Sequence, residues 1–139
     1  MAKKANKQEK ELLVTLRERH KRAVDADQDN RRKALEDMAA ADDKGDGAAF
    51  MDANYRFRDA WTSLVPNKRL VRAIQLYADH VRYLRAFTLD DPAVRAVVLK
   101  GLKRLAAALA AGDGEAAAEA MRAHLENAKQ ILIDKIRRT

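Results

Sequence analysis

Residues that interrupt helices are scarce in this chain and fall at a few separated places. Only 5 glycines and 2 prolines occur among its 139 residues. Four places combine glycine or proline with aspartate or asparagine, which favour turns and helix caps. They are Asp42 to Gly47, Pro66 with Asn67, Asp91 with Pro92, and Gly112 with Asp113. These breaks divide the chain into five segments, each with the length of a helix.

Within these segments the apolar residues recur at spacings of three and four, as they do on one face of a helix. The predicted helices cover approximately residues 8–40, 48–64, 68–87, 92–111 and 114–138. Residues 25–33 are almost wholly polar, so the first helix either breaks there or crosses solvent as one long rod. We predict an all-α fold, an antiparallel helical bundle of about five helices with this long, broken or continuous, first helix.

On four of the five predicted helices a stripe of residues indicates which face turns inward. On the first helix the stripe includes Leu13 and Leu16, which lie well before the polar stretch. The second stripe places two polar groups among three aromatic rings. Its members are Phe50, Asn54, Phe57, Arg58 and Trp61. The third forms an apolar seam of Leu70, Ile74, Tyr77, Val81 and Leu84, and the last comprises Met121, Leu125, Ala128, Leu132 and Ile136.

The composition excludes several kinds of protein. With no cysteine, the chain has neither disulfides nor a Cys-based zinc site, which fits a cytoplasmic location. No apolar run is long enough for an exported leader or a membrane span. The net charge is +7, with basic ends and an acidic stretch at 34–64. Such charges either meet a phosphate-bearing or acidic partner or form solvated helix faces.

Patterns typical of enzymes are missing. Ser63 is the only serine and lies near no patterned histidine and aspartate, and no glycine-rich phosphate loop occurs. His20, His80 and His124 are too far apart in sequence to suggest a metal site. We therefore expect no catalytic residues and no cofactor.

Two linked sequence patterns occur between Phe57 and Leu125. Their residues are Phe57, Arg58, Asn67 and Leu70, then Gly112, Asp113, Met121, His124 and Leu125. These patterns resemble the C-terminal ligand-binding (FCD) domain of GntR-type transcription regulators of the FadR subfamily, which shows Asp-x-x-Phe-His followed by Asn-x-x-Leu, and later Gly-Asp followed by Met-x-x-His-Leu. The resemblance covers about residues 48–128 and implies a small-molecule-sensing and dimerisation domain, hence a homodimer that binds a small organic acid or acyl ligand.

The resemblance also implies a site, because one aspartate and three histidines of the family surround a divalent metal that helps to hold the ligand. The corresponding positions here carry Asn54, Arg58, Leu102 and His124. Only His124 retains the ligating residue type, and one histidine cannot make the usual three- or four-ligand site. We therefore expect no metal.

Arg58 suggests a replacement for the metal. A guanidinium on an inward stripe can grip a carboxylate or phosphate by two parallel hydrogen bonds, or it can turn outward and pair with Asp59 or Asp52. Trp61 and Tyr77 either form an aromatic wall or belong to the core, and His124 either lines the pocket or is packed and hydrogen-bonded. The predicted ligand-binding residues are Asn54, Arg58, Trp61, Tyr77 and His124.

A second resemblance concerns the N-terminal part of the chain. Residues 17–38 look like the opening helix of portal proteins of short-tailed phages, although the Gly-Gln-Trp block that follows there is missing. The alternative function is therefore a structural or interaction bundle that binds a protein or nucleic acid through its first helix. The residues expected to make that contact are Lys21, Arg22, Arg31 and Arg32.

The expected organisation is one domain, with a basic helical segment at 1–47 and the FCD-like bundle at 48–138. Nothing in residues 1–47 has the pattern of a winged helix-turn-helix, so we expect a sensor domain without its DNA-binding head. Nucleic-acid binding by this chain alone is not expected.

Overall fold

The computed structural model describes residues 6–139, and all of its regular structure is helical. The helices are α1 (Lys7–Asp43), α2 (Gly47–Thr62), α3 (Lys68–Thr88), α4 (Pro92–Ala110) and α5 (Gly114–Arg137). No strand occurs among the described residues. The all-α class and the five helices are confirmed, with boundaries within a few residues of those predicted.

Local capping explains where the helices begin. Five side-chain oxygens accept a hydrogen bond from a backbone N–H of the first helical turn, which otherwise has no partner. The capping residues are Asn6, Asp46, Asn67, Asp91 and Asp113. The turns after α1 and α4 share the sequence Gly-Asp-Gly, and the first glycine of each has a φ of 68°. An L-residue is strained in this left-handed conformation, so glycine ends both helices.

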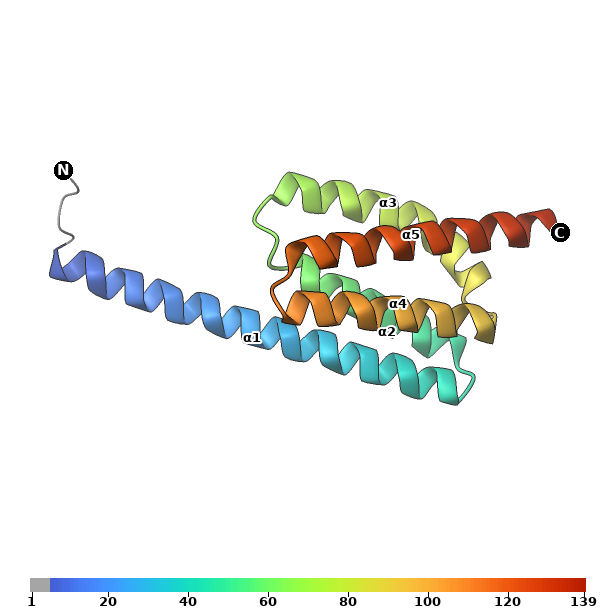
Figure 1. Ribbon diagram of the computed structural model, residues 1–139, viewed down its shortest axis with the longest axis horizontal. Coiled ribbons are helices and arrows are strands. Elements are labelled where there is room, and N and C mark those ends of the chain that lie inside the picture. The colour runs from blue at the N-terminus through green and yellow to red at the C-terminus, as the bar shows by residue number, and fades with distance from the viewer. Residues whose placement is uncertain (1–5) are drawn as a thin grey trace.

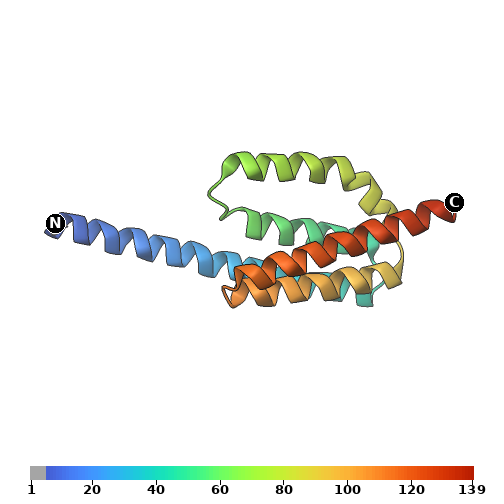
Figure 2. The ribbon, with the colours of Figure 1, turned by 45° about the horizontal axis from the view of Figure 1, so that its top comes forward.

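The helices pack as two hairpins with α3 on the outside (Figure 1). The second half of α1 packs along α2 and also against α4, while α4 packs along α5. In contrast, α3 makes only sparse contacts with α2 and α5, and Figure 2 shows it running beside α2 at the edge of the bundle. This loose position of α3 leaves room for a cavity between it and the rest of the bundle.

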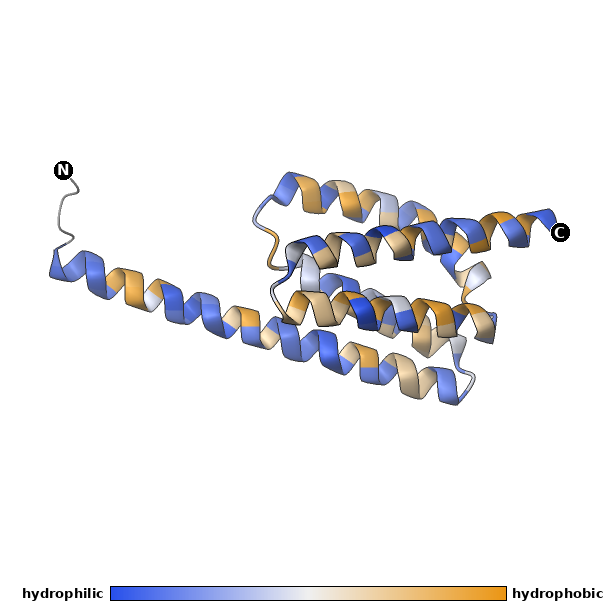
Figure 3. Ribbon diagram, viewed as in Figure 1, coloured by the Kyte–Doolittle hydropathy of each residue, from blue (hydrophilic) through white to orange (hydrophobic). Residues whose placement is uncertain are grey.

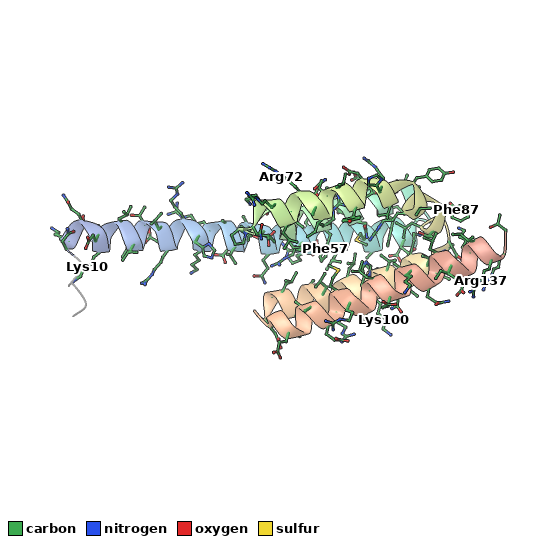
Figure 4. All side chains as sticks on the ribbon, turned by 90° about the horizontal axis from the view of Figure 1, so that it is seen from above. Lys10, Phe57, Arg72, Phe87, Lys100 and Arg137 are labelled. Carbon is green, nitrogen blue, oxygen red and sulfur yellow. The ribbon has the colours of Figure 1, made fainter. Side chains whose placement is uncertain are left out.

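Small and aliphatic side chains fill the core between α1, α2, α4 and α5. Phe50, Phe57 and Met38 are its largest fully buried side chains. Figure 4 labels Phe57 in the interior between the two halves of the bundle. Around them lie buried alanines, including Ala34, Ala53 and others on α4 and α5, which allow the helix backbones to approach closely. Each buried aromatic ring contributes roughly 1.5–3 kcal/mol of burial free energy.

The polar stretch in the first helix does not break it. α1 is continuous, and its first half extends beyond the bundle (Figure 1). Within the polar stretch, Asp27 and Arg31 are buried and form an ion pair with 3.4 Å between carboxylate and guanidinium atoms. The predicted inward stripe of the projecting half is not covered, because Leu13 and Leu16 are exposed to solvent. Figure 3 shows hydrophobic residues, in orange, on this projecting half of α1.

Two other inward faces differ from the prediction. On α5, Leu125 and Ile136 are 54% and 58% exposed, whereas the buried residues are Ala117, Ala120 and His124. The close approach of α4 selects the face with small side chains rather than the face with the largest apolar ones. On α3 no residue is fully buried, so the apolar seam predicted there is not buried against a neighbouring helix. Part of that seam faces the cavity described below.

Candidate functional site

A cavity of about 390 Å³ lies between α3 and the rest of the bundle. This volume falls at the small end of the roughly 300–1,000 Å³ that is typical of ligand sites. Its walls are mainly apolar, with a few polar groups directed into it. The lining residues are Asn54, Phe57, Arg58, Trp61, Ile74, Tyr77, Ala78, Val81, Arg85, Leu102, Met121, His124 and Leu125.

All five residues predicted to bind a ligand line this one cavity. Asn54, Arg58 and Trp61 come from α2, Tyr77 from α3 and His124 from α5. Asn54 and His124 are buried at its inner side, whereas Tyr77 is 72% exposed and lies at the mouth. The packing of α2 and α5 around this cavity therefore brings Asn54 and His124 together, although they are 70 positions apart in the sequence.

The sequence prediction missed Arg85, which brings a second guanidinium to the cavity. Its Nη1 donates a hydrogen bond to Oδ1 of Asn54, at 2.8 Å. Burial lowers the pKa of Arg85; the nearby Tyr55 opposes this shift and Arg58 adds to it. Among the described residues no carboxylate forms an ion pair with Arg85. The signal was present in the sequence, because Tyr77, Val81 and Arg85 follow one another at steps of four on one helix face.

Arg58 combines both arrangements considered for it. The guanidinium lines the cavity, yet its Nη2 lies 3.4 Å from Oδ1 of Asp59. It also packs over the Tyr55 ring, 5.1 Å from the ring centroid, a distance typical of a cation–π contact. Its side chain is 21% exposed. Arg58 therefore lies at the edge of the cavity with part of its charge already compensated.

His124 is a buried, uncharged member of the site. Burial lowers its pKa from 6.5 to about 4, and the positive charge of Arg85 contributes to this shift. Its Nδ1 lies 3.2 Å from the position that a Cβ on Gly101 would occupy. Glycine in the middle of α4 thus leaves the space that the imidazole needs. At neutral pH the ring is neutral, so it can donate one hydrogen bond and accept another.

The residues of this cavity do not fit the divalent metal implied by the family resemblance. Two guanidinium groups, Arg58 and Arg85, would repel a cation, and Leu102 supplies no ligand atom. Across residues 6–139, no three histidine, cysteine, aspartate or glutamate side chains are grouped so that they could hold a metal ion. The electrostatics favour an anion in this place instead.

The basic residues named for the alternative function do not form one surface. Lys21, Arg22 and Arg32 are exposed, but Arg31 is buried and paired with Asp27. Arg31 therefore does not share an exposed surface with the other three residues, because the helix turns it towards the bundle. None of the helices in the described part of the chain is long and apolar enough to cross a membrane.

Comparison with known protein families identifies the domain. The FCD domain family matches residues 13–127. Searches of curated proteins and of solved structures gave no significant match. The family match begins well before residue 48, where the sequence resemblance became clear, so most of α1, including residues 17–38, follows the family pattern. FCD domains are regulatory rather than catalytic and bind small effector ligands. The chain belongs to the FCD domain family, the C-terminal effector domains of GntR/FadR-type regulators.

Proposed function

We propose that this domain senses a small organic acid or acyl compound, which binds in the cavity between α2, α3, α4 and α5. The observation that carries the proposal is the convergence of polar groups from separate helices on one largely apolar cavity. Apolar walls with a few directed polar groups are characteristic of small-molecule sites. The proposal includes no catalytic step, since no residue of the cavity is placed as a nucleophile with an adjacent base.

The loose packing of α3 supports a sensing mechanism. Ile74, Tyr77 and Val81 of α3 line the cavity, but α3 contacts the other helices only sparsely. A ligand in the cavity would add contacts on both sides and favour the arrangement in which α3 is closed onto the bundle. Such a ligand shifts the equilibrium only by its difference in affinity for the two arrangements.

The test is native mass spectrometry of the untagged protein after gentle purification, combined with a variant that fills the cavity. Ala78 lines the cavity from α3, so Ala78→Phe should occupy the ligand's space. Ala73→Phe is the matched control, because Ala73 is exposed on the same helix and does not line the cavity. We expect a bound acid in the wild type and the control but not in Ala78→Phe. A wild-type protein that retains no ligand and is not stabilised by any added organic acid would contradict the proposal.

We further propose that the protein is a homodimer located in the cytoplasm. The first half of α1 carries exposed apolar side chains, Leu12, Leu13, Val14 and Leu16, which a second subunit could cover. Sedimentation velocity of the wild type and of Leu13→Glu/Leu16→Glu tests this contact. We expect a dimer that dissociates in the double variant. A wild-type monomer at all concentrations would contradict it.

A further inference from the structure

We infer that Arg85 is the anchor of the cavity and that it selects a ligand with one carboxylate on an apolar body. This inference rests on the proposed ligand-binding function and identifies its ligand class. It concerns a residue outside the predicted ligand-binding set, on the helix that packs most loosely.

Arg85 has hydrogen-bonding capacity that the described residues do not use. A guanidinium has five N–H donors, and within the described part of the chain the side chain of Arg85 makes one hydrogen bond, to Asn54. No described carboxylate neutralises its charge. Arg85 is partly buried, a partly buried charge without a counter-charge is unfavourable, and an anionic ligand would supply that counter-charge. Binding of an anion is therefore favoured by the protein's own unpaired charge.

Of the two guanidinium groups that line the cavity, only that of Arg85 has no carboxylate beside it among the described residues. Arg58 is already next to Asp59 and lies at the exposed edge. His124 is neutral, because burial and Arg85 keep its pKa near 4. The remaining walls are apolar, among them Ile74, Val81 and Leu102. A second carboxylate would be buried against these walls without a partner, whereas a hydrocarbon or aromatic body would fit them.

The guanidinium of Arg85 is also held in position before any ligand binds. The 2.8 Å hydrogen bond to Asn54 orients the guanidinium, whose planar fork can donate two parallel hydrogen bonds to one carboxylate. His124 lines the same cavity and, as a neutral imidazole, has an N–H to donate. These groups can satisfy a carboxylate without a metal ion.

The experiment is isothermal titration calorimetry in buffer with a metal chelator, using three probes of related size. Hexanoate carries one charge, hexanamide is its neutral analogue, and adipate adds a second carboxylate at the far end. The variants are Arg85→Met, which removes the charge at similar volume, and Arg82→Met. Arg82 is the matched control because it is exposed on the same helix and does not line the cavity.

We expect hexanoate to bind the wild type at least tenfold more tightly than either other probe. Arg85→Met should lose that preference, with hexanoate weakened at least tenfold, while Arg82→Met should behave like the wild type. Circular dichroism checks folding, and if Arg85→Met does not fold, Arg85→Lys replaces it. Lysine keeps the charge but not the fork, so it should retain the preference for the acid with weaker binding.

The outcomes separate the inference from the proposed function. Equal binding of hexanoate by the wild type and Arg85→Met would overturn the role of Arg85 and leave the ligand-binding function intact. Adipate binding as tight as hexanoate would overturn the single-carboxylate class. Binding of none of the three probes to the wild type would overturn the inference, whereas the proposed function would then be judged by the ligand retained in native mass spectrometry.

Discussion

Protonation of His124 should make the domain unstable in mild acid. The pKa of this imidazole is about 4 in the folded protein, mainly because it is buried, against 6.5 when it is free in solution. Between these two values the unfolded chain binds a proton that the folded protein does not, so the free energy of unfolding must fall as the pH falls. The contribution is complete above pH 6.5 and is lost progressively down to about pH 4.

The size of this effect follows from the shift of the pKa. Each pKa unit corresponds to about 1.4 kcal/mol, so the shift from 6.5 to about 4 amounts to roughly 3 kcal/mol. This is a large fraction of the ~5–15 kcal/mol by which domains are usually stable. Because His124 is only 6% exposed, solvent screening reduces this value little. Most of the loss should have occurred by about pH 4.5.

The assay is urea unfolding of the wild type and of His124→Gln at several pH values from 7.5 to 4.5. Carboxylates also titrate in this range, but they do so in both proteins, so the difference between the two free energies isolates His124. Over this pH range we expect the wild type to lose about 2.5 kcal/mol relative to the variant. His80→Gln is the control, because His80 is exposed on α3. A difference between wild type and His124→Gln that stays constant with pH would refute the burial argument.

Three further changes test the fold that holds the cavity. Arg95 is buried, with its Nε 2.9 Å from Oδ1 of Asp42. Arg95→Met leaves that carboxylate without its partner and should lower the free energy of unfolding, measured by urea titration, by about 3 kcal/mol. An unchanged free energy of unfolding would contradict the importance of this ion pair. Phe57→Ala should cost about 3–5 kcal/mol by the same assay, because a fully buried ring leaves a void; a cost below 1 kcal/mol would mean that the core collapses around it. Gly112→Ala should lower the melting temperature through about 1 kcal/mol of strain at its φ of 68°, whereas Gly114→Ala has no positive φ and should not.

Local sequence determined the number, type and boundaries of the helices. Four helices are capped by side chains that bond backbone groups only two or three residues away, so these caps can be predicted without knowledge of the fold. The capping residues are Asp46, Asn67, Asp91 and Asp113. The family pattern likewise placed Asn54, Arg58 and His124 at positions that meet in space, whereas Trp61 and Tyr77 were predicted from helical spacing. The proximity of these three residues was therefore predictable from the resemblance.

Which side chains are buried and which charges are paired, in contrast, depended on how the helices pack against one another. Leu13 and Leu16 have the spacing of a buried stripe but no helix covers them, and Leu125 is exposed because α4 approaches the alanine face of α5. Arg31 and Arg85 are ordinary basic residues in the sequence. Only the tertiary structure buries Arg31 with its helix neighbour Asp27 and places Arg85 at an apolar cavity without a carboxylate. Helix periodicity defines the possible faces, but the neighbouring helices decide which face is buried and which charge is left unpaired.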